Sequence, residues 1–205
     1  MKIKAIIFDL DDTVYDCTGL LVGAARRRAA KAMVEAGLPM SAGEAYKLQN
    51  TIVGKYGPSS LVFDEIAKMY GMNHSLVECA LKAYNSDEVS DIEPFPDVIP
   101  TLRQLRLKKY KLFLVTMGVH GRQEKKLEQL GISPYFDEIV VNDQEVGLLL
   151  EDCFRGLLQK YNLLPGEVAV VGDRVGAELR VAKTMGMSAI QMLHGRFKVE
   201  TPNND

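Results

Sequence analysis

The sequence predicts an α/β protein, with a Rossmann-like, three-layer core built on a parallel sheet and an inserted helical-bundle cap. Short apolar runs alternate with helix-like segments after residue 94. This alternation is typical of parallel strands joined by right-handed helical crossovers. Residues 17–90 contain no convincing strand and have helical periodicity instead. We therefore expect the core at residues 1–15 and 92–205 and the cap at residues 16–91.

Composition narrows the class of protein. The chain has 205 residues, of which 47% are hydrophobic and 25% are charged, as in soluble globular proteins. Its formal net charge of −2 gives no bulk attraction to nucleic acid or to an anionic membrane, so neither is expected as a partner. The three cysteines lack the spacing of a metal site or a disulfide framework, which favours a reducing compartment. With no secretory or membrane-spanning segment visible, we expect a cytoplasmic protein.

The first strand is expected at residues 4–8, an apolar run that leads directly into Asp9 and Asp11 and then Thr13. The carboxyl ends of strands are where open α/β sheets bind ligands. Two carboxylates so close together repel each other unless a cation or a proton neutralises one of them. The pair therefore indicates a functional site.

The insertion begins with an alanine-rich helix expected at residues 18–36. Ser41 with Glu44, and Ser75 with Glu78, have the spacing of capping boxes at the starts of two further helices.

The later strands also end in small or polar residues. Strands are expected at residues 111–115, 138–141, 168–171 and 189–193, and helices at residues 99–106, 122–130, 151–161 and 176–185. Thr116 ends one strand, Asp173 ends another, and Glu178 follows five residues later. Because parallel strands end at one edge of the sheet, these side chains are expected to converge with the first carboxylate pair. A site of oxygen ligands alone favours Mg²⁺.

These residues resemble the motifs of the haloacid dehalogenase superfamily, subfamily I, whose members carry a C1 helical cap. The first motif is the run from Asp9 to Val14, the second is Thr116-Met117-Gly118, and the fourth is Gly172-Asp173 with Glu178. The helical insertion directly after the first motif is similar to the C1 cap, and the segment around Pro94 is similar to the return to the core.

The resemblance implies a role for each residue. Asp9 is the nucleophile that forms an aspartyl phosphate, and Asp11 is the general acid and base. The phosphoryl group is bound by Thr116, Met117 and Gly118. The implied Mg²⁺ ligands are Asp9, Asp11 through its backbone carbonyl, Asp173 and Glu178. The dehalogenase branch of the superfamily lacks an acid at the position of Asp11, so this residue indicates an oxygen leaving group.

One expected residue is missing. The family's third motif is a lysine that should fall at residue 150, or at residue 148 under another alignment, and leucine stands at both positions. Loss of such a cation costs roughly 10²–10³ in rate, by analogy with an oxyanion donor. Arg122, Lys125 and Lys126 lie on the helix after the second motif, but residues past its first turn are expected to point away from the cleft.

The function expected from the resemblance is Mg²⁺-dependent hydrolysis of a small phosphomonoester, a phosphorylated metabolite, under a cap that closes over the site and sets specificity. Two alternatives remain. One is a phosphomutase with the same catalytic residues. The other is a catalytically impaired binding protein, or an enzyme of low activity, because Leu150 or Leu148 replaces the lysine.

Overall fold

The computed structural model describes residues 2–57, 61–86, 89, 91–143, 147 and 149–201. The chain divides into two compact units, Met1–Thr18 with Val89–Asp205, and Gly19–Glu88. Among the residues described, no helix is long and apolar enough to cross a membrane. The first unit contains the sheet and the second contains helices α1 to α4.

The sheet has five parallel strands in the order β3-β2-β1-β4-β5, which confirms the predicted fold class. The strands are β1 (Ala5–Phe8), β2 (Lys111–Met117), β3 (Glu138–Asn142), β4 (Val168–Gly172) and β5 (Ser188–Gln191). Strand β1 lies in the centre, where Ala5 is level with Lys111 of β2 and with Val168 of β4. The carboxyl ends of β1, β2 and β4 therefore lie next to one another.

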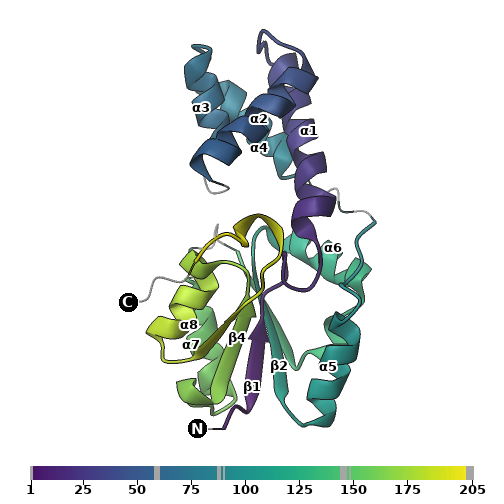
Figure 1. Cartoon of the computed structure of the whole chain (residues 1–205), viewed down its shortest axis with the longest axis vertical. Helices are drawn as coiled ribbons and strands as arrows, with labels where there is room; N and C mark the ends of the chain where they lie inside the picture. Colours follow the sequence, from purple (N-terminus) through teal and green to yellow (C-terminus); the bar gives the residue numbers. More distant parts are fainter. Residues whose placement is uncertain are drawn as a thin grey trace. The chain divides into compact units, whose positions relative to one another are not determined.

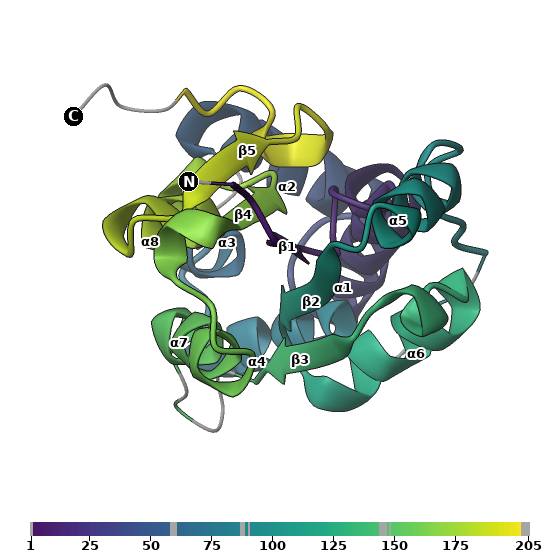
Figure 2. The same ribbon diagram turned by 90° about the horizontal axis from the view of Figure 1, so that it is seen from below.

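Helices cover both faces of the sheet. These helices are α5 (Val98–Leu107), α6 (His120–Leu130), α7 (Leu150–Lys160) and α8 (Arg180–Thr184). Helices α5 and α6 cover one face, and α7 and α8 cover the other (Figures 1 and 2). Ile7 of β1 belongs to the same buried cluster as Phe154 of α7, whereas Phe8 clusters with Leu102 of α5. Because successive residues of a strand face opposite sides, burial on both faces explains the continuous apolar run of β1.

The two ends of the insertion are tied together within the core unit. Tyr15 pairs with Asp11 on one side and with Pro94 on the other, and the Phe95 N–H donates to the Val14 carbonyl at 2.9 Å. The chain therefore leaves and re-enters the core at one place, directly after the first carboxylate pair.

Asp12 fixes the loop that follows β1. Its carboxylate accepts hydrogen bonds from the Thr18 N–H at 2.7 Å and from the Thr18 hydroxyl at 2.6 Å. The backbone of Gly195, beyond β5, lies against the same carboxylate, so a Cβ atom at this position would come within 2.1 Å of Asp12 Cγ. Only glycine allows this close approach, and its φ of +62° also favours glycine.

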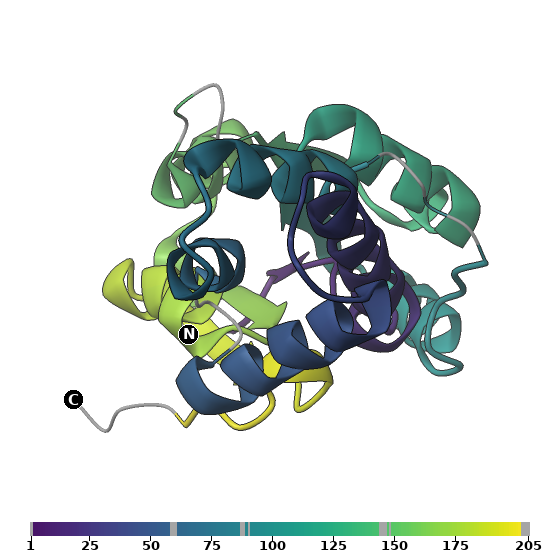
Figure 3. The ribbon, with the colours of Figure 1, turned by 90° about the horizontal axis from the view of Figure 1, so that it is seen from above.

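The second unit consists of four helices (Figure 3): α1 (Gly23–Glu35), α2 (Ala42–Tyr56), α3 (Val62–Met69) and α4 (His74–Tyr84). Alanine, leucine, isoleucine and methionine side chains from all four helices form one buried cluster. The capping box at the start of α2 is confirmed, since Ser41 and Glu44 bond reciprocally. The box predicted at Ser75 is wrong: α4 begins at His74, two residues earlier than a cap at Ser75 requires, and the side chain of Asn73 accepts a hydrogen bond from the Ser75 N–H instead. Asparagine is an equally good N-cap, and it occurs two residues nearer the preceding turn.

Candidate active site

Three carboxylates gather at the carboxyl edge of the sheet. Asp9 follows β1, Asp173 follows β4, and Glu178 lies on the π-helical turn Val175–Leu179 that leads into α8. One carboxylate oxygen from each of the three residues lies within 4.8 Å of the others. Adjacent strand ends and the following helical turn thus bring together residues separated by more than 160 positions in the sequence.

Gly172 makes room for this cluster. A Cβ atom at Gly172 would lie 2.4 Å from Glu178 Oε1 and 2.7 Å from its Cγ, far inside van der Waals contact. The same Oε1 atom accepts a hydrogen bond from the Arg174 N–H at 2.7 Å, which fixes the carboxylate beside Asp173. The glycine before Asp173 is therefore required by the close approach of the Glu178 side chain.

The cluster holds more negative charge than its surroundings stabilise. Burial raises the pKa of Asp9 well above its usual value, and the charges of Glu178, Asp11 and Asp173 raise it further. Burial, followed by the charges of Glu178 and Asp12, raises the pKa of Asp173 to about 8. Burial also raises the pKa of Glu178. Oxygen ligands in a buried, mutually repelling set fit a divalent cation such as Mg²⁺, which would stabilise the ionised forms.

The end of β2 is held by α6. Thr116 is buried, and its hydroxyl accepts a hydrogen bond from the Gln123 side-chain amide at 2.7 Å. The same amide nitrogen donates to the Met117 carbonyl at 2.8 Å. The Gly118 N–H donates to the Asn142 carbonyl at 3.2 Å, so in this structure it is engaged with the neighbouring strand.

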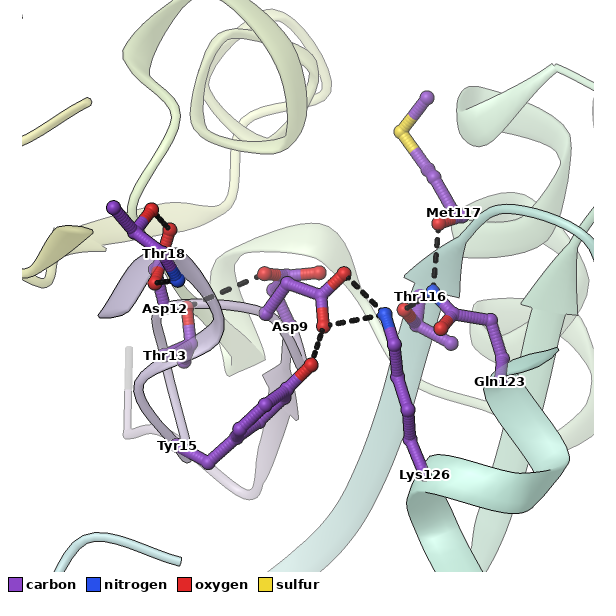
Figure 4. A network of polar contacts seen from close by, with 10 residues as sticks. Asp9, Asp12, Thr13, Tyr15, Thr18, Thr116, Met117, Gln123 and Lys126 are labelled. Carbon is purple, nitrogen blue, oxygen red and sulfur yellow. Dashed lines mark hydrogen bonds and ion pairs between the residues drawn. The ribbon is translucent and has the colours of Figure 1, made fainter. Parts of the chain in front are cut away.

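Asp11 lies between two donors that the sequence did not reveal. Lys126 Nζ of α6 is 2.8 Å from Asp11 Oδ1 and 2.7 Å from Asp11 Oδ2, and the Tyr15 hydroxyl donates to Oδ1 at 2.6 Å. Figure 4 labels Lys126 and Tyr15, and their dashed lines meet on the carboxylate of Asp11, which carries no label. The expectation that this part of α6 points away from the cleft is wrong for Lys126. Its side chain is only 4% exposed and reaches the carboxylate of Asp11 from the second turn of α6.

These contacts set the ionisation of Asp11. Burial by itself opposes ionisation, but the charge of Lys126, with hydrogen bonds from Lys126, Tyr15 and Cys17, outweighs it and lowers the pKa of Asp11. In the same environment, burial and the negative charge of Asp11 raise the pKa of Cys17 to about 12. Asp9 and Asp11 thus have opposite pKa shifts although they are two residues apart. With no cation at the cluster these shifts favour a protonated Asp9 and an ionised Asp11, so a bound cation and a bound substrate must reverse both for the roles that the resemblance implies.

One cavity of about 90 Å³ receives most of these side chains. The predicted residues that line it are Asp9, Asp11, Thr116, Met117, Asp173 and Glu178. Two residues not predicted, Arg174 and Arg196, also line it, with their guanidinium groups 4.9 and 5.1 Å from the ring centre of Phe197. Arginine at the edge of an acidic site is suited to bind an anionic group such as phosphate.

Leu150, the first candidate position for the missing lysine, begins α7 and packs against the apolar cluster beneath the sheet. Leu148, the second candidate position, lies outside the residues that the structure describes.

Some residues of the site were not predicted, and they differ in whether the sequence carries a signal for them. Gln123 and Lys126 stand three residues apart and share the buried face of α6 with Leu127 and Leu130. Two polar residues on the apolar stripe of an otherwise polar helix are a signal that could have been recognised. Tyr15 and Arg196 carry no such signal, since their positions depend on the path of irregular segments.

Comparisons with known proteins point to one family. The family model described as haloacid dehalogenase-like hydrolase matches residues 3–186. A glyceraldehyde 3-phosphate phosphatase of Methanopyrus kandleri is 36% identical, covering 99% of this chain and 89% of the relative. A protein of the same description from Methanocaldococcus jannaschii is 33% identical over 96% and 87% of the two chains.

Among solved structures, a predicted phosphoglycolate phosphatase from Haemophilus somnus has the same fold, with a TM-score of 0.73 and 20% identity over 96% of this chain and 88% of the other. The chain therefore belongs to the haloacid dehalogenase-like hydrolase family.

Proposed function

We propose that this chain hydrolyses a small phosphomonoester with Mg²⁺, using Asp9 as the nucleophile. That it is a phosphatase of its family follows from the family model and the full-length relatives. The residue roles, the metal and the substrate are the proposal. The observation that carries it is the cavity in which Asp9, Asp11 and Asp173 meet Thr116.

The first step would transfer the phosphoryl group to Asp9. A carboxylate oxygen of Asp9 attacks phosphorus, and the bond from phosphorus to the ester oxygen breaks. Asp11, in its protonated form, gives its proton to that oxygen, which leaves as an alcohol. The negative phosphate ester opposes a second charge beside it, which favours the protonated form of Asp11 when substrate is bound.

The second step would regenerate the enzyme. A water molecule attacks the aspartyl phosphate and gives a proton to Asp11, the bond between phosphorus and Asp9 breaks, and inorganic phosphate is released. Asp9, Asp173 and Glu178, with the Asp11 backbone carbonyl, would hold Mg²⁺. When bound, Mg²⁺ supplies neutralising charge for the phosphoryl oxygens. The Thr116 hydroxyl, which lines the cavity, would bind a phosphoryl oxygen.

We infer a short phosphorylated metabolite as the substrate. The relatives from Methanopyrus kandleri and Methanocaldococcus jannaschii are named for glyceraldehyde 3-phosphate. The cavity of about 90 Å³ at the carboxylates offers the space of about three water molecules, which suits a phosphoryl group. Glyceraldehyde 3-phosphate is therefore the first compound to test.

The impaired-protein alternative loses its main support. It depended on the leucines at the expected lysine positions, but Lys126 places an ammonium group beside Asp11 from another helix. A phosphomutase would share every catalytic residue, and no further contact of the described residues favours it.

The test is release of inorganic phosphate from glyceraldehyde 3-phosphate and from an aryl phosphate, with Mg²⁺ and with EDTA. We expect activity that requires Mg²⁺ and is lost in Asp9→Asn, which keeps the size of the side chain but removes the nucleophile. The matched control is Asp152→Asn, which changes an exposed carboxylate in the first turn of α7 that is not among the described residues lining the cavity. Activity that persists in Asp9→Asn contradicts the assignment of the nucleophile.

A further inference from the structure

The buried face of α6 carries two polar side chains that serve the site in different ways. Gln123 holds the end of β2 through Thr116 and Met117, whereas Lys126 reaches past the strand to Asp11. The side chain of Lys126 is only 4% exposed, which is exceptional for lysine, while that of Asp11 is 29% exposed. Lys126 therefore lies behind Asp11, and Asp11 faces the cavity.

A buried ammonium group needs a partner. Removing such a charge from water costs several kcal/mol, which only close pairing and hydrogen bonding offset. Both oxygens of Asp11 lie within 2.8 Å of Lys126 Nζ, so the pair is as close as a charge-assisted hydrogen bond allows. This geometry fixes the Asp11 carboxylate in one orientation, and the Tyr15 hydroxyl at 2.6 Å adds a contact from a second direction.

Lys126 is not among the described residues that line the cavity. Its recorded contacts go to Asp11, which does line the cavity. An effect of Lys126 on the reaction should therefore pass through Asp11.

We propose that Lys126 is a positioning residue for the general acid: it holds the Asp11 carboxyl group in the orientation from which the leaving oxygen is protonated. This rests on the proposed function. It also assigns the cation of this active site to α6, in place of the position occupied by Leu150.

The proposal predicts a dependence on the leaving group. An alkyl phosphate leaves as a strongly basic alkoxide and needs the proton from Asp11, whereas a nitrophenyl phosphate leaves as a stable phenolate and does not. The kcat/KM value reports on the steps up to formation of the aspartyl phosphate, where this difference acts. In Lys126→Met we expect kcat/KM for an alkyl phosphate to fall by about 10²-fold or more, within the range of general acid catalysis, and that for the nitrophenyl ester by less than about tenfold.

The matched control is Lys125→Met, which removes a lysine from the exposed face of the same helix turn. Its kcat/KM values should stay close to those of the wild type with both substrates. If both lysine variants lose activity equally, the effect of Lys126→Met comes from the net charge of α6, and the proposal is wrong.

A double-mutant cycle with Asp11→Asn separates the positioning role from a direct contact with the phosphoryl group. If Lys126 acts only through Asp11, then adding Lys126→Met to Asp11→Asn should change kcat/KM by less than about twofold. The double variant leaves no unpaired buried charge, so we expect it to fold even if Lys126→Met alone does not. Its kcat/KM can then still be compared with that of Asp11→Asn.

Equal losses with both substrates, or losses that multiply in the double variant, would overturn the proposal in favour of a direct phosphoryl contact. A wild-type protein that hydrolyses neither ester would instead contradict the proposed function.

Discussion

Replacing Gly172 with alanine should weaken Mg²⁺ binding without touching any proposed ligand. The new methyl group would lie 2.4 Å from Glu178 Oε1, 2.7 Å from Cγ and 2.9 Å from Cδ. Because the whole end of the Glu178 side chain is too close, a small rotation cannot relieve the overlap. Glu178 must leave its position beside Asp173.

The expected loss follows from the contacts that Glu178 makes. Its carboxylate gives up the hydrogen bond from the Arg174 N–H at 2.7 Å, and a bond of this charged kind contributes about 1.5–3 kcal/mol. One of the three clustered carboxylates also leaves the cation site. Loss of contacts that orient a metal ligand costs about 10–100-fold in affinity, and we expect the Mg²⁺ dissociation constant of Gly172→Ala to rise by this factor.

The assay is calorimetric titration with Mg²⁺, together with the Mg²⁺ dependence of phosphate release. Gly156→Ala on α7 is the matched control, since a Cβ atom there has no neighbour within 4 Å. Combining Gly172→Ala with Glu178→Ala removes the overlap, so the double variant should bind Mg²⁺ no more weakly than Glu178→Ala alone. An unchanged Mg²⁺ affinity in Gly172→Ala would refute the reasoning.

Three further predictions concern stability and reactivity. The pKa of Asp173 is raised from 3.8 to about 8 in the fold, so its contribution to stability is present below about pH 4 and is lost as the pH rises through about 8. Without metal, the melting temperature should fall over this pH window, and Mg²⁺ should raise the melting temperature more at about pH 9 than at about pH 5. Equal effects of Mg²⁺ at the two pH values would contradict the link between Asp173 and the cation site. Burial raises the pKa of Cys17 to about 12, so a thiol reagent at neutral pH should modify the exposed Cys79 first. Peptide mapping by mass spectrometry would show the order of labelling, and faster labelling of Cys17 would contradict the burial of its thiol. Gly195→Ala would place a Cβ atom 2.1 Å from Asp12 Cγ at a φ of +62°, and urea denaturation should show a loss of about 2 kcal/mol or more; an unchanged midpoint would count against this contact.

The sheet was predictable because each strand carries its own signal. The apolar runs of β1 and β4 are buried on both faces, and each run ends at an aspartate. Once the strands are parallel, their ends must share one edge, and this places Asp9 and Asp173 together without further information.

The cation was not predictable by the same reasoning. Whether Lys126 points into the site depends on the angle at which α6 leaves β2, and a fraction of a helical turn decides between the cleft and solvent. The positive φ of Gly118, +145°, turns the chain at that junction. Sequence periodicity identifies the buried stripe of α6, but it does not determine how far along the stripe the site extends.

The proposed role of Lys126 has a consequence for how members of this family are classified. A motif search that requires lysine at the column of Leu150 would discard this chain as inactive, although an ammonium group stands 2.7 Å from Asp11. In this chain the positive charge beside Asp11 comes from α6, and Leu150 packs against the apolar core. Alignments of relatives should therefore be searched for paired columns, in which lysine at the α6 position accompanies an apolar residue at the start of α7.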